Sequence, residues 1–182
     1  MESCDVLIVG GGPAGSTLAW KLRKRGLDAL VLDKSVFPRD KVCAGWITPA
    51  TTELLQLDRS DYSRARVLQH ISGFRTSMIG GAEVVTRYGN TVSYGIRRAE
   101  FDHYLLQRSG ARLRLGQPLK TMERKNGSWI INDEVKTPLV VGAGGHFCPV
   151  SRFLRGSGEK KTSAVRFLSQ ASGKKRLVST AR

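Results

Sequence analysis

The chain has 182 residues, of which 40% are hydrophobic, and this is enough for one domain of ordinary size with its own core. No apolar run approaches the ~18 residues that cross a bilayer, and Glu2 and Asp5 make the start acidic where a secretory signal would be basic. Three widely spaced cysteines, Cys4, Cys43 and Cys148, argue against a disulfide framework and against a metal site. We therefore expect a cytoplasmic protein with no transmembrane segment and no metal.

The formal net charge of +15 is concentrated toward the C-terminal end. Residues 151–182 hold nine Lys/Arg against one acid, Glu159, and residues 157–182 show no strand, helix cap or apolar face. One interpretation is a basic, disordered tail, and the other is a tail that binds nucleic acid or an anionic surface. Because Phe153 and Phe167 stand apart from the basic clusters, base stacking is not supported and no specific nucleic-acid partner is predicted.

The N-terminal region shows a β-α-β pattern. Residues 5–9 form a short apolar run that is typical of a buried parallel strand. A glycine-rich loop follows, and Ser16–Arg25 then has the apolar spacing of a helix. Ala29–Leu32 predicts a second buried strand, which ends at Asp33.

The elements predicted after this unit are shorter. They are a loop at Phe37–Pro49, a helix at Thr51–Leu57, strands at Ile71–Ile79 and Glu83–Tyr88, a helix at Arg98–Ser109, and strands at Arg112–Leu115, Leu119–Arg124, Ser128–Asn132 and Leu139–Val141. Phe101, Leu105 and Leu106 are expected on the inward face of the Arg98–Ser109 helix. Asn126-Gly127 indicates a hairpin turn.

The loop between the first strand and the first helix reads Gly10-Gly11-Gly12-Pro13-Ala14-Gly15, which satisfies the G-x-G-x-x-G pattern. Gly10 permits the tight turn, Gly12 lets a pyrophosphate approach the backbone, and Gly15 allows close packing of helix on strand. The N–H groups of the loop, which includes Pro13 and Ala14, and the positive end of the helix dipole then face the phosphates. This context predicts a dinucleotide site.

Asp33 supplies the acid that such sites carry at the end of the second strand. Its carboxylate can accept hydrogen bonds from the adenosine ribose and would repel a 2′-phosphate, which argues against NADP at this loop. Lys34, the next residue, is included in the candidate cofactor site. These residues alone leave FAD and NAD as alternatives.

Residues 1–155 resemble the FAD-dependent oxidoreductases of the geranylgeranyl reductase type, within the wider p-hydroxybenzoate hydroxylase-like flavoprotein group. Four segments carry the resemblance: the strand with Gly10–Gly15, Phe37-Pro38-Arg39-Asp40-Lys41-Val42-Cys43-Ala44-Gly45, Arg98-Ala99-Glu100-Phe101-Asp102, and Val141-Gly142-Ala143-Gly144-Gly145. The resemblance favours FAD over NAD and implies an α/β, Rossmann-like FAD-binding fold with a partly parallel sheet and an inserted antiparallel β region.

The resemblance also implies roles for single residues. Arg39 and Lys41 would lie over the cofactor, where cations meet flavin or pyrophosphate oxygens. Arg98 would bind near the ribityl–phosphate portion, and Gly142 would border the cofactor. Cys43 would lie near the isoalloxazine as a substrate-side or redox residue, whereas residue statistics favour a small buried hydrophobe there.

Two features depart from the family pattern. Gly144 stands where the group has an Asp that contacts the cofactor, and Cys148–Ser151 replaces its Ser-x-Val-Arg, with Arg152 displaced by one position. Members of the group are also much longer, and residues 157–182 resemble none of their second half. We expect from this a truncated or frameshifted end.

The sequence thus predicts an FAD-binding domain over residues 1–156, with part of a substrate domain near residues 67–96, and a tail at residues 157–182. The expected function is flavin-mediated hydride transfer to or from a small-molecule or isoprenoid-like substrate, with NAD(P)H or another electron donor. The alternatives are an inactive FAD-binding fragment and an anionic-surface binder that uses the tail. The chain's three histidines form no recognisable acid–base arrangement, so no catalytic residue is assigned.

Overall fold

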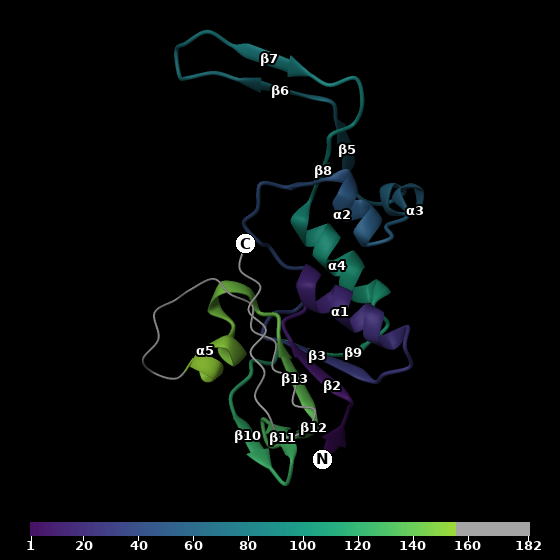
Figure 1. Cartoon of the computed structure of the whole chain (residues 1–182), viewed down its shortest axis with the longest axis vertical. Coiled ribbons are helices and arrows are strands. Elements are labelled where there is room, and N and C mark those ends of the chain that lie inside the picture. The colour runs from purple at the N-terminus through teal and green to yellow at the C-terminus, as the bar shows by residue number, and fades with distance from the viewer. Residues whose placement is uncertain (156–182) are drawn as a thin grey trace, which may run out of the picture. The chain divides into compact units, whose positions relative to one another are not determined.

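The computed structural model describes residues 1–155, which form two compact units (Figure 1). The first unit comprises Met1–Val36 and the described residues from Leu105 onward, and the second comprises Phe37–Tyr104. The tail predicted at residues 157–182 lies outside the described residues. No helix in residues 1–155 is long and apolar enough to cross a membrane.

The first unit is built on a parallel sheet with the strand order β13-β2-β3-β9. Its strands are β2 (Val6–Val9), β3 (Ala29–Asp33), β9 (Arg112–Leu115) and β13 (Leu139–Gly142). All four residues of β2 are buried, as are the first four of β3, which explains why both strands appear in the sequence as continuous apolar runs. The predicted parallel strands are confirmed, and the strand predicted at Arg112–Leu115 is β9, which pairs with β3 in the same sheet.

Helix α1 (Pro13–Arg23) packs against β2 and β3. It begins three residues before the predicted start at Ser16, because the ring of Pro13 fits the first helical position, where no N–H donor is needed. Gly15, Ser16 and Ala19 are its buried residues, and these small side chains bring the helix axis close to the sheet.

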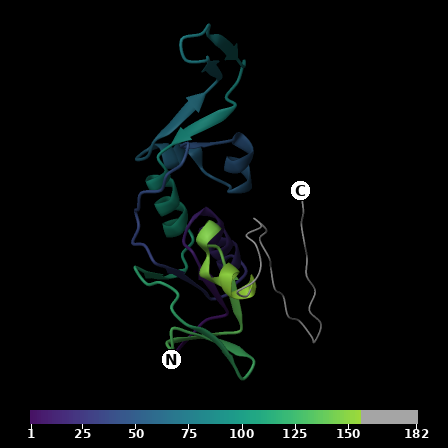
Figure 2. The same cartoon turned by 90° about the vertical axis from the view of Figure 1, so that its left-hand side faces the viewer.

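A smaller sheet with the strand order β1-β12-β11-β10 covers the core residues on one face of the main sheet. It contains β1 (Glu2–Ser3), β10 (Met122–Lys125), β11 (Ser128–Ile131) and β12 (Val135–Thr137), and the short helices η1 (Gly145–Phe147) and α5 (Pro149–Arg155) follow β13. Leu7 and Leu30 pack in one cluster with Ile131 and Val150. The predicted hairpin between β10 and β11 is confirmed (Figure 2): Asn126 and Gly127 have φ of 49° and 78°, as a tight turn with two left-handed residues requires.

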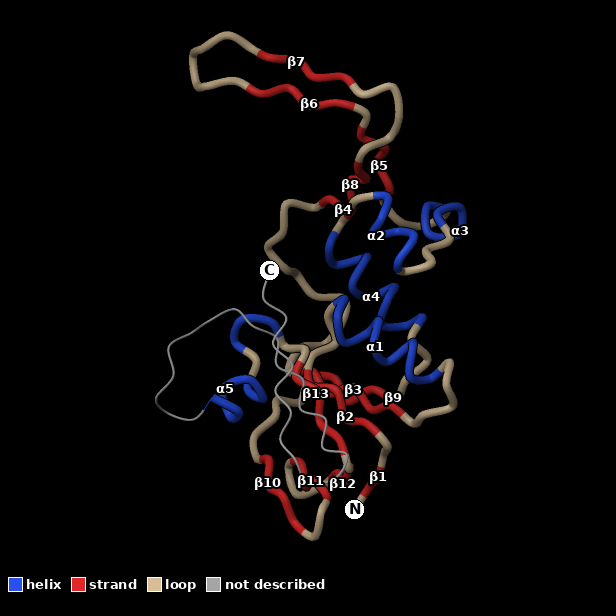
Figure 3. The backbone as a smooth tube through the Cα atoms, viewed as in Figure 1, coloured by secondary structure: helices blue, strands red, loops and turns tan. Residues whose placement is uncertain are grey.

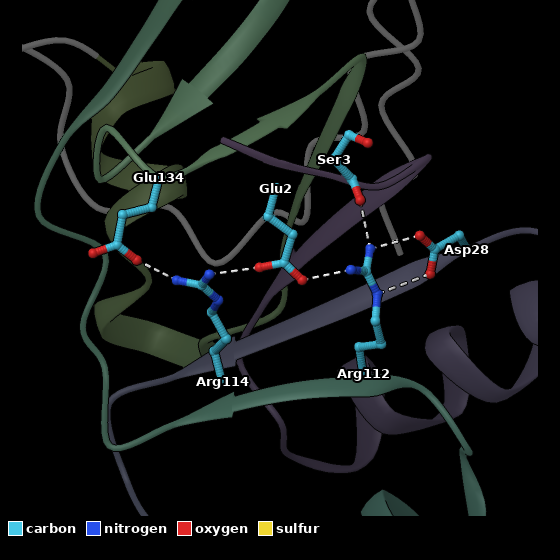
Figure 4. Close-up of polar contacts among 6 residues, drawn as sticks. All are labelled: Glu2, Ser3, Asp28, Arg112, Arg114 and Glu134. Atoms are coloured by element: carbon cyan, nitrogen blue, oxygen red, sulfur yellow. Dashed lines mark hydrogen bonds and ion pairs between the residues drawn. The ribbon is translucent and has the colours of Figure 1, made fainter.

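An ion-pair network ties β9 to the N-terminus (Figure 4). Glu2 lies between Arg112 and Arg114, and each of its carboxylate oxygens accepts from a different arginine. Arg112 also contacts Asp28 at 2.6 Å, and Arg114 contacts Glu134. Because side chains alternate along a strand, Arg112 and Arg114 lie on the same face of β9 and both reach Glu2.

The second unit contains short strands and helices (Figure 3). They are β4 (Trp46–Ile47), α2 (Pro49–Leu54), α3 (Arg59–Ser63), β5 (Leu68–Ile71), β6 (Gly73–Thr76), β7 (Val84–Arg87), β8 (Ser93–Ile96) and the start of α4 (Arg98–Arg108). The strand order of its main sheet is β4-β8-β5, with all pairs antiparallel, and β6 and β7 form a separate hairpin. The inserted antiparallel region predicted from the sequence is therefore confirmed.

Several details of this unit were predicted wrongly. The predicted loop Phe37–Pro49 contains β4, and the helix expected at Thr51–Leu57 begins at Pro49 and ends at Leu54. The single strand expected at Ile71–Ile79 is divided at Ser72, because β5 pairs with β8 whereas β6 pairs with β7. Helix α3 was not expected, and it is organised by the Asp58 side chain, which accepts from the N–H of Asp61 at 3.0 Å. Phe101, Leu105 and Leu106 of α4 are buried as predicted.

The contact between α1 and β2 generates a stability prediction. A Cβ added at Gly15 would overlap the carbonyl oxygen of Gly10 and approach Ile8 Cγ2 at 3.2 Å. We expect Gly15→Ala to lower the free energy of unfolding by about 1–3 kcal/mol or more, since neither backbone segment can move without shifting a strand. Urea denaturation measures this loss. Gly89→Ala is the control, because a Cβ there meets nothing within 4 Å; equal midpoints for the two variants would contradict the prediction.

Candidate functional site

The glycine-rich loop lies at the carboxyl end of β2 and makes a turn that only glycines permit at two positions. Gly10 has a φ of 116°, and a Cβ there would lie 2.6 Å from the carbonyl carbon of Ala143. Its N–H donates to the carbonyl oxygen of Leu32 at 2.8 Å. Gly15 is the second such position, because its own Cβ would overlap Gly10. These two glycines are therefore required by the fold itself.

Gly12 differs from them. It is the N-terminal cap of α1 and has a φ of −69°, a value that any residue adopts. No side chain caps this end of the helix, and its first turn contains no acid. The first N–H groups of α1 and the positive end of its dipole thus lack a negative partner from their own helix, which is the arrangement that binds phosphates. Glycine at position 12 leaves the approach to these groups free of a side chain.

Asp33, at the end of β3, holds this loop in place. Its Oδ2 accepts from the N–H of Gly11 at 2.7 Å, and its Oδ1 accepts from the N–H of Ser35 at 2.8 Å. The residue is half-buried, and each carboxylate oxygen has a further lone pair for a ligand hydroxyl. The side chain expected to bind ribose therefore also fixes the shape of the phosphate loop. Lys34 beside it is exposed.

The loop is joined by a segment distant in sequence. The N–H of Ala143 donates to the carbonyl oxygen of Val9 at 2.8 Å, so that residues 141–145 lie beside the end of β2. In open α/β sheets, ligands bind outside the carboxyl ends of the strands where the strand order reverses, and β2 occupies this place between β13 and β3. Gly142 has a packing reason of its own, since a Cβ there would lie 2.9 Å from Cys148 Sγ. The cradle fits an anionic dinucleotide.

In the second unit, two of the predicted cofactor cations converge on one carboxylate. Asp102 is completely buried in α4. Arg98 Nε lies 2.5 Å from its Oδ1, one helical turn away, and Arg39 Nη2 lies 3.5 Å from its Oδ2. Asp102 Oδ2 has no hydrogen-bond partner among the described residues, so its contact with Arg39 is purely ionic. Asp102 thus restrains two guanidinium groups that come from different elements.

The role of Asp102 was missed in the sequence, although a signal was present. Asp102 stands four residues after Arg98, which is the spacing of an ion pair on one helix face, and directly follows the inward-facing Phe101. The pair also accounts for a cation at the start of α4, where the helix dipole alone would disfavour it. Arg39 is further placed over the ring of Phe37, 4.8 Å from its centroid, whereas Lys41 is exposed.

Cys43 corrects one expectation. Residue statistics favoured Cys43 as a small buried hydrophobe. This expectation is wrong, because the Cys43 thiol is exposed on the loop before β4. The N–H of Gly45 donates to its sulfur at 3.4 Å, and this bond together with the nearby Arg98 guanidinium lowers the pKa of the thiol. Cys4 has the opposite environment, since burial raises the pKa of its thiol. Cys148 is also buried.

The predicted cofactor residues are divided between the two units. The first unit holds Gly10, Gly12, Pro13, Ala14, Gly15, Asp33, Lys34 and Gly142, and the second holds Arg39, Lys41 and Arg98. The residues of the first unit lie around the end of β2. In the second unit Arg39 and Arg98 lie near the start of α4, and Lys41 lies in the exposed loop before β4. Within residues 1–155, no group of three His, Cys, Asp or Glu side chains could hold a metal ion.

Comparison with known proteins gives a family match and several relatives. The FAD binding domain model matches residues 3–117. A menaquinone reductase of Mycobacterium tuberculosis is 38% identical over 122 residues, which are 63% of this chain and 29% of that protein. A geranylgeranyl diphosphate reductase of Rhodobacter capsulatus is 30% identical over 152 residues, covering 78% of this chain and 37% of that protein.

Among solved structures, a geranylgeranyl bacteriochlorophyll reductase-like protein from Thermoplasma acidophilum has a TM-score of 0.66 and 26% identity, and the match covers 80% of this chain and 40% of that one. The chain therefore spans about a third of the length of the curated relatives named above. The family match confirms FAD as the expected cofactor, and the relatives confirm the resemblance to geranylgeranyl reductases.

The environment of Cys43 generates a pH prediction. Because its pKa is lowered, the thiolate is present from a lower pH than in an unperturbed thiol, and the rate of alkylation by iodoacetamide should rise with a lower midpoint than that of glutathione. Mass spectrometry should find Cys43 modified before the buried Cys4 and Cys148. Arg98→Gln should move the midpoint upward. If Cys43 in the unaltered chain is alkylated with the same midpoint as glutathione, its pKa is not lowered and the prediction is contradicted.

Proposed function

Because the chain belongs to the FAD binding domain family, we propose that Gly10–Gly15 and Asp33 hold the adenosine diphosphate half of FAD. The observation that carries this proposal is the N-terminus of α1, which has no side-chain cap and no acid in its first turn, at the carboxyl end of β2. A pyrophosphate there would accept from the N–H groups of Ala14 and Gly15 and would lie at the positive end of the helix dipole.

Asp33 selects the nucleotide in this proposal. The lone pairs that it does not use for Gly11 and Ser35 accept hydrogen bonds from the ribose hydroxyls. Its negative charge disfavours a phosphate on the 2′ position. Since the same carboxylate holds the loop through the N–H of Gly11, a change at Asp33 would alter both the ribose contact and the shape of the phosphate site.

Arg39 and Arg98 are the proposed cofactor ligands of the second unit. A guanidinium has five N–H donors; Arg98 uses one of them for Asp102, and Arg39 meets Asp102 through an ionic contact alone. The remaining donors can bind phosphate or flavin oxygens, and the buried carboxylate limits the directions in which they point. Lys41, which is exposed, is a further cation of the second unit.

For the protein to which this sequence belongs, we propose an oxidoreductase that transfers hydride to or from an isoprenoid-like organic substrate. The geranylgeranyl reductases among the matches support this substrate class. FAD supplies the hydride chemistry when bound, and NAD(P)H or another donor supplies the electrons. The residues of this chain bind and orient the cofactor.

A titration of purified chain with FAD tests the cofactor site, with Gly12→Val as the variant. The valine side chain should block the approach of the pyrophosphate to the helix N-terminus while the φ of −69° remains accessible, so that the fold survives. We expect at least a tenfold weaker FAD affinity, about 1.4 kcal/mol. Gly89→Val, at a glycine with open space around it, should bind FAD as the unaltered chain does. Equal affinity of all three proteins would show that the cofactor is placed wrongly.

Anaerobic reduction of the FAD-loaded chain tests the proposed activity. Addition of geranylgeranyl diphosphate should return the flavin absorbance to its oxidised form and yield a product heavier by two hydrogens in mass spectrometry. The fully saturated diphosphate is the control, since it has no alkene to reduce. If FAD remains reduced with both compounds, the chain binds the cofactor without turnover, which favours the inactive-fragment alternative.

A further inference from the structure

The second unit contains a hollow of about 510 Å³ that none of the residues proposed to hold FAD lines. Its walls come from the start of α2, from α3, from β5, from β8 and from the residues just before β8. A volume of this size falls in the range of small-molecule sites, which is about 300–1,000 Å³. The polar side chains around it have the composition of an anion site.

Arg59 is the cation of this hollow. Its Nη1 donates to the hydroxyl of Tyr94 at 2.5 Å. Within residues 1–155 no carboxylate forms an ion pair with Arg59; of the nearby acids, Asp58 caps α3 and Asp61 accepts from the hydroxyl of Tyr104. The guanidinium of Arg59 also lies over the ring of Tyr94, 5.7 Å from its centroid. Of its five N–H donors, one is used in a hydrogen bond within residues 1–155, which leaves others for a ligand. The positive charge therefore lies beside the hollow without a neutralising partner.

His70, which lies on β5, is held by two contacts. Its Nδ1 lies 3.0 Å from Thr91 Oγ1, and its ring lies edge to face with the ring of Tyr94, with 5.1 Å between the centroids. When the Thr91 hydroxyl donates to Nδ1, the proton of the neutral imidazole lies on Nε2, which then becomes a donor. Tyr94 thus links both basic side chains, because Arg59 bonds its hydroxyl and His70 packs on its ring.

The arrangement of donors favours a phosphate group. The guanidinium of Arg59, the imidazole of His70 and the hydroxyl of Ser60 line the same hollow from two elements, and together they offer several donors to a group with three terminal oxygens. Pro49 and Leu68 add apolar surface to the same hollow. This surface provides room for an organic body next to the phosphate.

We propose that this hollow is a binding site for the phosphate group of a small phosphorylated compound, with Arg59 as its principal ligand. The site is separate from the proposed FAD residues and goes beyond the proposed function. Two sources share the chemistry, namely inorganic phosphate and an organic phosphate monoester whose body lies against Pro49 and Leu68.

Isothermal titration calorimetry of the full chain with inorganic phosphate, phenyl phosphate and benzoate tests the proposal. We expect Arg59→Gln to weaken phenyl phosphate binding at least about tenfold, the loss of one charge-assisted contact. Arg64→Gln is the matched control, because Arg64 follows α3 directly and does not line the hollow; it should change the affinity by less than about twofold. FAD titration of both variants should match that of the unaltered chain, which separates this site from the proposed cofactor site.

Tighter binding of phenyl phosphate than of inorganic phosphate assigns the site to an organic monoester, and equal binding assigns it to free phosphate; both support the proposal. Tighter binding of benzoate, no saturable binding of either phosphate, or equal losses in Arg59→Gln and Arg64→Gln would overturn it. Thr91→Val provides a second test if Arg59→Gln alters the circular dichroism spectrum. It removes the hydroxyl that orients His70 and should weaken phenyl phosphate binding several-fold; an unchanged affinity would count against the site.

Discussion

The first unit depends on the contact between the backbone of Gly15 and the carbonyl of Gly10, where no side chain fits. This contact brings α1 against the ends of β2 and β3, and it points the uncapped N-terminus of the helix beyond the carboxyl edge of the sheet. Gly10 in turn lies against the backbone of Ala143, so that the loop after β13 meets the same edge. The position of the proposed phosphate site is thus a consequence of backbone packing, since the glycines permit an approach that larger residues would prevent.

Two aspartates organise the candidate cofactor residues in the two units. Asp33 binds the loop through the N–H of Gly11 and fixes its shape. Asp102 is buried and restrains the guanidinium groups of Arg98 and Arg39. In both places a carboxylate fixes groups that are positive or carry positive dipoles, and these groups are the ones suited to an anionic dinucleotide. Preorganisation of this kind lowers the conformational entropy lost when a ligand binds.

The sequence predicted the β-α-β unit, the hairpin at Asn126-Gly127 and the inward face of α4, because each depends on residues close together in the chain. It did not predict helix α3, which is a single turn that one Asp58 cap organises, nor the break between β5 and β6 at Ser72. The break follows from the partners of the two strands, and pairing between distant segments leaves little local signal. The exposure of Cys43 was missed for a similar reason, since residue statistics ignore the loop in which the thiol stands.

By itself the sequence determined that a glycine-rich turn joins a buried strand to a helix, and that an acid ends the next strand. Glycine spacing and apolar runs are local properties, and they are sufficient for a dinucleotide loop. Only the tertiary structure decided that Asp33 binds the glycine-rich loop, that Asp102 joins Arg39 to Arg98, and that Arg59, His70 and Tyr94 line one hollow. Some of the residues in these groups, such as Arg39 and Arg98, are dozens of positions apart in the sequence. The groups arise because burial and strand pairing bring side chains together, which the order of residues does not reveal.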